Sequence, residues 1–271
     1  MKGKIIAIII ALVAVTGSII AIFFLQQRGY LTEIIQILPD DINLVSYVNA
    51  ESLAEDPDLE YWHNSLVDNT GRTIEDVIGI DLSGAQALVT AYTSFYEGFI
   101  IVIKGDFDLE DVRDALIEND FIKGEYEGEN IWTWTEEPLA VVFVKEMIIF
   151  GVTDSVKAVV YVNQNDELTL YSDEDIKSIV DRLPVGISSA IYRGEEAFGD
   201  ISAVAGGTSI TKGNGVLEIK GWFKFESEAD AEAALQDVKD LMNDMWNTTD
   251  MDGRLRGQFI ELTGETAIPT E

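Results

Sequence analysis

The chain has 271 residues, with 18 basic and 49 acidic side chains, one His, no Cys and a formal net charge of −31. The lack of Cys excludes disulfides, thiolate metal sites and a Cys nucleophile, and the acidic charge excludes nucleic-acid binding driven by electrostatic attraction. Hydrophobic residues make up 47% of the sequence, which is enough for a folded core and argues against general disorder.

The first feature along the chain is a run without charged side chains, from residue 5 to residue 25. As an α-helix this run is about 30 Å long, which matches the hydrocarbon thickness of a bilayer. A cleavable signal peptide has a shorter apolar region followed by small residues, whereas this run ends in Ile22-Phe23-Phe24-Leu25. The pattern predicts an uncleaved transmembrane helix at residues 5–25, after a cytoplasmic segment at residues 1–4.

The charges that flank this run predict its orientation. Lys2 and Lys4 precede the run, and only Arg28 follows it before Arg72. Because basic residues favour the cytoplasmic side, the N-terminus is expected inside and the remainder of the chain outside the cytoplasm. We therefore expect a single-pass protein of the cell membrane with a strongly acidic extracytoplasmic part.

The region after the apolar run divides at two prolines. Leu31, Ile34, Ile35 and Leu38 recur at helical spacing, which predicts an amphipathic stalk at residues 26–38 that ends before Pro39. Pro184 is the best internal boundary. The predicted units are a first half of the ectodomain at residues 39–183, a second half at residues 184–262 and a polar tail at residues 263–271.

Hydrophobic periodicity predicts alternating strands and helices in both halves. Strands are expected at residues 42–48, 85–91, 99–104, 128–135, 139–144, 147–151, 187–192, 215–225 and 254–262. Helices are expected at residues 73–77, 108–119, 153–162, 172–183 and 227–246, with helical or irregular structure at 51–69 and a hairpin connection at 206–213. This order predicts an α+β fold of mainly antiparallel sheets with helices packed on one face.

A short pattern occurs twice, as Ile103-Lys104-Gly105-Asp106-Phe107 and as Ile219-Lys220-Gly221-Trp222-Phe223, each time before a predicted helix. One interpretation is a duplicated strand-helix-strand unit. The alternative is chance recurrence of a short pattern built from a glycine and apolar residues.

Several short motifs carry a family resemblance. Leu38-Pro39-Asp40-Asp41 is followed by an apolar strand and Asn49-Ala50-Glu51-Ser52-Leu53, then by a Gly-x-Phe unit before a helix, and later by Ile149-Phe150-Gly151-Val152-Thr153-Asp154. In these motifs the chain resembles an uncharacterised prokaryotic family of membrane-anchored surface proteins of unknown function. The resemblance implies an anchored α+β ectodomain over residues 39–262 and brings no catalytic residues.

Candidate catalytic residues are few. His63 is the sole imidazole, and a Ser-His-Asp triad would have to include it, but its neighbours Tyr61, Trp62 and Asn64 do not support one. With 49 acidic residues, carboxylate pairs are expected by chance, so sequence spacing selects none. We expect a protein that is not an enzyme and has no cofactor other than calcium.

Calcium is considered because a hard cation prefers several oxygen ligands and would reduce the self-repulsion of the acidic chain. The candidate ligands are Asp56 and Asp58, Asp250 and Asp252, and the acidic run at residues 163–167. None of these segments has the spacing of an EF-hand. A solvated acidic surface is the alternative interpretation.

Two further sites concern the outer surface. Trp132 and Trp134 alternate along one predicted strand and therefore share a face: exposed, that face would form a stacking platform for sugar, and covered by a helix it would be core. Asn247 begins an Asn-Thr-Thr triplet after a predicted helix and is a candidate for N-glycosylation.

These observations favour a non-catalytic binding or structural module displayed at the cell surface. The expected partners are the membrane and either a cell-envelope protein with a basic or cation-bridged surface or another copy of the chain, but no nucleic acid. The alternatives are a pilin-like filament subunit, since Gly3 precedes the apolar run, an accessory subunit of a membrane enzyme complex, and a hydrolase that uses a carboxylate pair.

Overall fold

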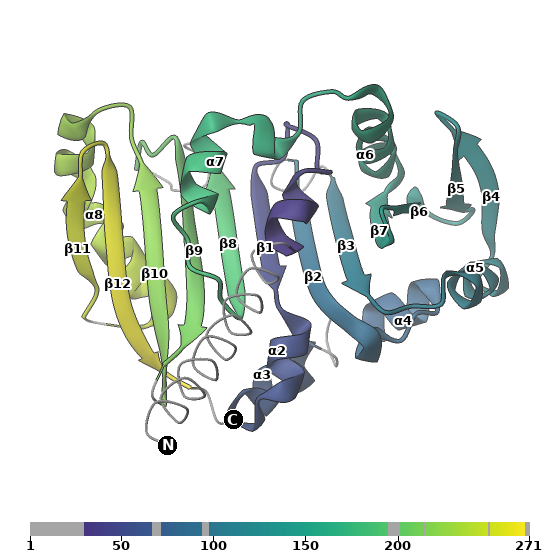
Figure 1. Ribbon diagram of the computed structural model, residues 1–271, viewed down its shortest axis with the longest axis horizontal. Helices are drawn as coiled ribbons and strands as arrows, with labels where there is room; N and C mark the ends of the chain where they lie inside the picture. Colours follow the sequence, from purple (N-terminus) through teal and green to yellow (C-terminus); the bar gives the residue numbers. More distant parts are fainter. Residues whose placement is uncertain are drawn as a thin grey trace, which may run out of the picture.

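The computed structural model describes residues 30–66, 72–93, 98–194, 201–213, 215–248 and 250–268. The described chain forms an antiparallel sheet in the order β11-β12-β10-β9-β8-β1-β2-β3-β7-β6-β5-β4 (Figure 1). The predicted α+β class with a large antiparallel sheet is therefore confirmed.

The strands are β1 (Leu44–Val48), β2 (Ala85–Tyr92), β3 (Phe99–Gly105), β4 (Phe121–Tyr126), β5 (Glu129–Trp134), β6 (Leu139–Val144), β7 (Met147–Val152), β8 (Ser188–Arg193), β9 (Ala205–Lys212), β10 (Val216–Lys224), β11 (Asp252–Arg256) and β12 (Phe259–Ala267). The helices are α2 (Ala50–Glu55), α3 (Glu60–Leu66), α4 (Arg72–Ile78), α5 (Leu109–Glu118), α6 (Thr153–Asn165), α7 (Glu174–Val180) and α8 (Glu228–Trp246), with short 3-10 turns at Pro57–Leu59, Leu82–Gly84 and Leu170–Ser172. Residues 30–35 are also helical, and we call them the first helix.

The two halves of the chain meet at the centre of the sheet. β1 pairs antiparallel with β8, so that Tyr47 lies opposite Ser189, and the sheet continues through the predicted boundary at Pro184. In each half, three neighbouring strands of the sheet precede a helix, α5 after β3 and α8 after β10, although α2, α3 and α4 lie between β1 and β2 in the first half. The repeated five-residue pattern does not mark equivalent positions, because Gly105 ends β3 whereas Gly221 lies inside β10.

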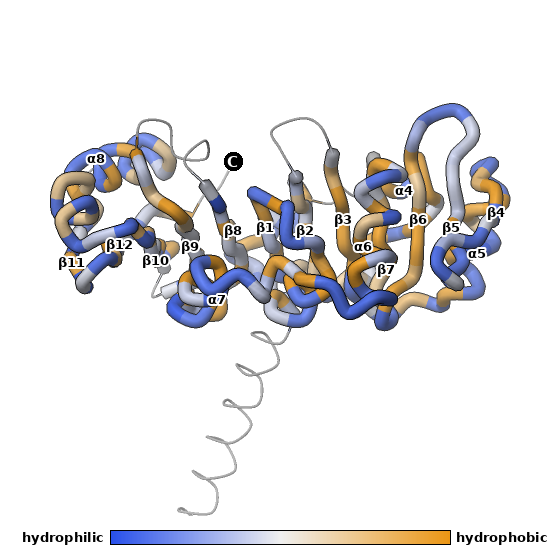
Figure 2. The backbone as a smooth tube through the Cα atoms, turned by 90° about the horizontal axis from the view of Figure 1, so that it is seen from above, coloured by the Kyte–Doolittle hydropathy of each residue, from blue (hydrophilic) through white to orange (hydrophobic). Residues whose placement is uncertain are grey.

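Helices cover both faces of the sheet, not one face as the sequence predicted. The first helix, α6 and α7 pack on one face, whereas α4, α5 and α8 pack on the other, and Figure 2 shows α7 and α8 on opposite sides. The physical reason is that the central strands are apolar on both sides. In β2, Val89 belongs to the core under the first helix and Leu88 to the core on the opposite face. Strands that are apolar on both sides need helices on both faces of the sheet to shield them from water.

The predicted stalk is part of the folded domain where the structure describes it. Leu31 is 9% exposed, Ile34, Ile35 and Leu38 are completely buried, and all four belong to the same core as β1, β2 and β3. The apolar side of this helix therefore packs on the sheet. The predicted transmembrane helix at residues 5–25 lies outside the described residues. Within the described ranges, no helix is both long enough and apolar enough to cross a bilayer.

Two strands were not predicted. β4 contains a glycine and two charged residues in the sequence FIKGEY, and β9 was interpreted as a hairpin connection because of Gly206 and Gly207. In the structure Gly207 lies directly under α7, where an added Cβ would be 2.7 Å from Ile179 Cγ2 and 3.0 Å from Leu183 Cδ1. Gly207 therefore permits a helix to pack closely on the strand and does not form a turn.

The C-terminal region forms a hairpin where one strand and a polar tail were predicted. β11 and β12 are joined at Gly257, which has a φ of +63°. Residues 263–267, predicted as tail, continue β12 and pair with β10. Thr263 and Glu265 are exposed on the face opposite to the α8 core, to which Leu262 belongs.

Candidate functional site

The predicted calcium ligands Asp56 and Asp58 already bind a cation, the ammonium group of Lys212. Lys212 Nζ lies 2.6 and 2.7 Å from the two carboxylate oxygens of Asp56 and 2.7 Å from Asp58 Oδ2. These hydrogen bonds lower the pKa of Asp56 and raise that of Lys212. The cluster therefore ties the turn after α2 to the end of β9, a contact that the sequence did not reveal because residues 56 and 212 are far apart.

The second predicted pair lies at the edge of an open hollow. Asp250 and Asp252 line a depression of about 810 Å³ on the face of β10 and β12 opposite α8, together with Glu218, Lys220 and Glu265. Asp252 also pairs with Arg254 at 3.0 Å. Among the described residues, no three acidic or histidine side chains come together in a geometry suited to a metal ion. Calcium binding at Asp250 and Asp252 stays a prediction.

The two tryptophans lie mainly in the core. Trp132 is 2% exposed and meets Phe143 edge to face, with 5.1 Å between the ring centres. Trp134 is partly buried and stacks on Phe121, with 6.0 Å between the ring centres. The exposed sugar platform is not present at these positions, because α5 and its neighbours cover this face of β5. The alternative that both side chains are core residues describes Trp132 fully and Trp134 in part.

The other predicted positions are on the surface. Asn247 is exposed and ends α8 in a left-handed conformation with a φ of +48°, so its side-chain amide is accessible as a glycosylation acceptor would require. His63 lies in α3 and is partly exposed. Glycosylation of Asn247 stays a prediction.

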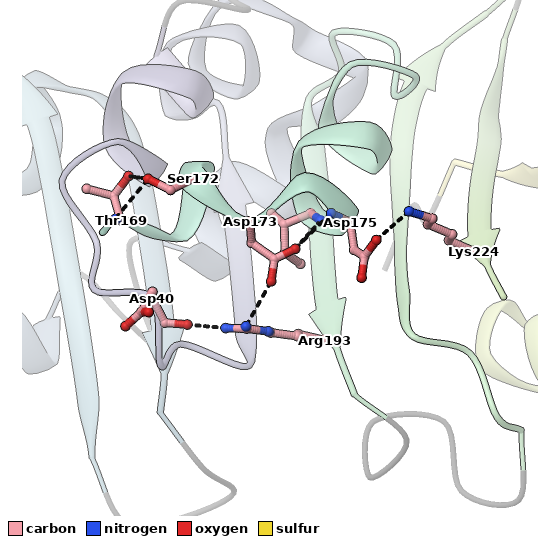
Figure 3. A network of polar contacts seen from close by, with 8 residues as sticks. Asp40, Thr169, Ser172, Asp173, Asp175, Arg193 and Lys224 are labelled. Atoms are coloured by element: carbon pink, nitrogen blue, oxygen red, sulfur yellow. Dashed lines mark hydrogen bonds and ion pairs between the residues drawn. The ribbon is translucent and has the colours of Figure 1, made fainter. Parts of the chain in front are cut away.

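A polar network that the sequence did not reveal holds α7 and the segment after the first helix on the sheet (Figure 3). Arg193 of β8 pairs with Asp173 at 2.8 Å and also donates to the carbonyl of Asp40. The Asp173 carboxylate accepts hydrogen bonds from the backbone N–H groups of Asp175 and Ile176, so Asp173 caps α7, one residue after the predicted helix start at residue 172.

Further contacts extend this network at both ends. Lys224 of β10 pairs with Asp175. At the other end, Leu170 N–H donates to the carbonyl of Leu38 at 2.9 Å, and the amide of Asn163 donates to the carbonyl of Ile37 at 2.9 Å. The segment after the first helix is therefore held by α6, by the turn before α7 and by β8.

A narrow crevice lies between the first helix and the chain that follows α7. One side of the crevice is formed by Leu31 and Thr32, and the other side by residues 180, 181 and 183–186. Tyr47 and Ser189 of the sheet complete the lining. Its volume is about 50 Å³, which is enough for water but far smaller than a pocket for a drug-sized ligand. Tyr47 is 2% exposed and its hydroxyl has no hydrogen-bond partner in the described part of the chain. Burial raises the pKa of Tyr47, so the phenol stays protonated and can donate.

Basic side chains also gather around Phe259 and Glu261, near the start of β12. The guanidinium carbon of Arg182 lies 4.0 Å from the centre of the Phe259 ring, and Lys220 and Arg256 each contact Glu261 at 3.1 Å. Burial alone would raise the pKa of Glu261, but the hydrogen bonds from Lys220 and Arg256 outweigh it and lower the pKa. These cations are engaged with aromatic or acidic partners, so the cluster stabilises the sheet surface beside α7.

Comparison with known proteins finds a sequence relative and crystal structures of a protein with a similar fold. No family model matches the chain. The chain is 26% identical over 276 residues to the uncharacterized protein MJ0635 of Methanocaldococcus jannaschii, covering 97% of this chain and 95% of the relative. The predicted resemblance to proteins of unknown function is thus confirmed.

The structural likeness is to TP0453. Its crystal form III has a TM-score of 0.53 at 8% identity, covering 86% of this chain and 94% of that chain, and its crystal form IV has a TM-score of 0.51 at 8% identity, covering 86% and 92%. At this identity the likeness shows a shared fold. The chain therefore resembles an uncharacterised protein along nearly its whole length and has a fold already observed in a solved structure.

Proposed function

We propose that this protein is a single-pass, membrane-anchored module whose acidic α+β domain lies outside the cytoplasm and acts by binding or structural contact without catalysis. The observation that carries this proposal is the position of the first helix. Leu31, Ile34, Ile35 and Leu38 are buried in the central core, and only residues 26–29 separate this helix from the apolar run at 5–25.

That spacing supports a domain held close to the bilayer. Four residues span at most about 14 Å when fully extended. The face of the sheet that carries the first helix would therefore lie near the membrane surface. A contact with a neighbouring envelope protein would benefit from this restriction, because membrane anchoring raises the effective concentration of the domain.

Two features of the described surface support a contact function. The cations nearest the predicted acidic sites are paired with carboxylates, as Lys212 is with Asp56, and the Tyr47 crevice is too small for most substrates. The partner best suited to such an acidic domain has a basic surface or is bridged by divalent cations. We also propose that the two halves of the sheet, with α5 after β3 and α8 after β10, derive from a duplicated unit.

The test uses the full-length protein in intact cells. Protease added outside should remove the domain, and alkaline washing of membranes should not release the intact protein. A double variant with Leu12→Arg and Val15→Arg places two charges in the middle of the apolar run, where each opposes insertion by about 2.5–3.5 kcal/mol, and should release the protein from the membrane. Protection of the domain in intact cells together with its digestion after lysis would contradict the proposed topology.

A further inference from the structure

The sheet ends at β4, and its outer edge is unpaired within the described chain. β4 pairs with β5 alone and is the last strand in the sheet order. Figure 1 shows it at the end of the sheet opposite β11. An unpaired edge strand presents backbone N–H and C=O groups that can bind another strand.

The hairpin geometry identifies which backbone groups point outward. β4 and β5 are joined by Glu127 and Gly128, both with positive φ, as in a type I′ turn. In such a hairpin the residues beside the turn, Tyr126 and Glu129, exchange hydrogen bonds, and every second pair does so after them. Lys123 and Glu125 therefore direct their backbone groups away from β5, towards the free edge.

The side chains of β4 are complementary to those of a second, antiparallel copy of β4. If the two-fold axis passes at Gly124, Lys123 of each copy lies opposite Glu125 of the other, and Ile122 lies opposite Tyr126. An axis at residue 123 or 125 would instead place two lysines or two glutamates against each other. Opposite charges in directly opposed positions stabilise a strand pair, and like charges destabilise it. Among the registers centred on residues 123–125, the charges therefore favour the one centred on Gly124.

Exposure along β4 fits the same arrangement. Residues 122–125 are exposed, and Ile122 has 59% of its surface accessible although it is a large apolar residue. Ile122 and Tyr126 share the face of the sheet that carries the first helix, because Phe121 packs into the opposite core and side chains alternate along the strand. In the two-fold arrangement Ile122 of one copy would cover Tyr126 of the other.

We propose that two copies of this chain associate through antiparallel pairing of their β4 strands, centred on Gly124, to form one continuous sheet. The two-fold axis is perpendicular to this sheet, so the first helices of both copies lie on the same face. If the proposed membrane anchoring is correct, both anchors can enter the same bilayer; this last point alone rests on the proposed function.

Cysteine cross-linking tests the register in the full-length protein in detergent, since the chain has no native Cys. In the proposed dimer the two Cα atoms of residue 124 are about 4.5 Å apart, as in a non-hydrogen-bonded pair, within the range that a disulfide spans. Gly124→Cys should therefore cross-link rapidly on mild oxidation. An added Cβ at Gly124 meets only Ile131 O at 3.8 Å and Ile131 Cγ2 at 3.9 Å, so the variant should fold normally.

Glu125→Cys is the matched control. In the proposed register the two Cα atoms of residue 125 are about 8 Å apart, because each is displaced along the strand from the axis. A disulfide cannot bridge this distance without backbone movement. We expect cross-linking of Gly124→Cys at least tenfold faster than that of Glu125→Cys. Equal rates, or no dimer with either variant, would overturn the proposal.

Charge exchange provides a second measurement that needs no cysteine. Glu125→Lys places lysines opposite one another and should raise the dimer dissociation constant about tenfold, because the two-fold axis repeats the unfavourable pair. Combining it with Lys123→Glu should restore the wild-type constant. If the double variant stays as weak as Glu125→Lys in analytical ultracentrifugation, the pairing is wrong. These measurements do not depend on membrane topology, so failure of the dimer and failure of the anchoring proposal can be distinguished.

Discussion

Lys212 lies between the two carboxylates that the sequence identified as calcium ligands, with its Nζ 2.6 Å from Asp56 Oδ1. An ammonium group thus neutralises charges that a metal ion would otherwise neutralise. The arrangement joins the corner after α2 to the end of β9, so it contributes to the position of α2 and α3 on the sheet.

Replacing Lys212 with Gln should expose this pair to metal. The variant should melt at a lower temperature than the wild type in EDTA, because Asp56 and Asp58 repel each other without the ammonium group. Calcium should then raise the melting temperature of the variant more than that of the wild type. Differential scanning fluorimetry with Lys145→Gln, the same change in the exposed β6–β7 turn, provides the control. An equal response to calcium in all three proteins would contradict the prediction.

The same ion pair should contribute to acid sensitivity. Its hydrogen bond from Lys212 lowers the pKa of Asp56 in the folded state. A carboxyl group of lowered pKa stabilises the fold above its unfolded pKa, near 3.9, and this contribution disappears as pH falls through the folded pKa. Asp56→Asn should therefore lose less stability than the wild type between about pH 5 and about pH 2. Urea titrations across this range measure the difference, and parallel losses in both proteins would contradict the assignment.

Trp132 should behave as a core residue. Trp132→Ala removes a side chain that is 2% exposed and in contact with Phe143, and should lower the free energy of unfolding by about 3–5 kcal/mol. Trp134→Ala should have a smaller effect because that side chain is partly exposed. Urea unfolding followed by circular dichroism compares the two. A larger decrease in the free energy of unfolding for Trp134→Ala than for Trp132→Ala would contradict the assignment of Trp132 to the core.

The sequence predicted elements best where local interactions determine them. The helices predicted at residues 108–119 and 227–246 are observed as α5 and α8, and the side chains of Asp108 and Ser227 accept hydrogen bonds from the first turn of each helix. The strand at 139–144 was predicted with its observed bounds because it is continuously apolar. These features depend on a few neighbouring residues.

Features that depend on long-range contacts were missed. β4 has exposed charged residues and a glycine because it is an edge strand, and β9 contains Gly207 because α7 lies on it. The contact of Lys212 with Asp56 joins positions 156 residues apart. An amphipathic helix such as residues 30–35 has the same pattern whether its apolar side faces a partner or its own sheet, so its burial could not be predicted.

Gly207 should tolerate no side chain. An added Cβ would be 2.7 Å from Ile179 Cγ2 and 3.0 Å from the carbonyl oxygen of Ala190, so α7 would have to shift. We expect Gly207→Ala to destabilise the protein by about 1–3 kcal/mol through overpacking. Gly84→Ala is the control, because its Cβ would make only ordinary contacts. Equal stability of the two variants in urea unfolding would show that α7 can move without loss.

The folded domain should begin at residue 30 rather than at Pro39. A protein that lacks residues 1–29 retains every buried side chain of the first helix and should unfold cooperatively. Removal of residues 1–38 should prevent stable folding, because it deletes Leu31, Ile34, Ile35 and Leu38. Each fully buried side chain of this kind contributes about 1.5–3 kcal/mol, so their sum is comparable with the total stability of a typical domain, about 5–15 kcal/mol.

Point variants separate packing from chain length in this prediction. Ile34→Ala should lower the free energy of unfolding by about 2–5 kcal/mol, since Ile34 is completely buried. Gln36 is exposed in the turn that follows the first helix, so Gln36→Ala should change the free energy of unfolding by less than about 0.5 kcal/mol. Chemical denaturation of the protein that begins at residue 30 measures both. Equal stabilities of these two variants, or cooperative unfolding of the protein without residues 1–38, would show that the first helix is dispensable and would restore its interpretation as a stalk.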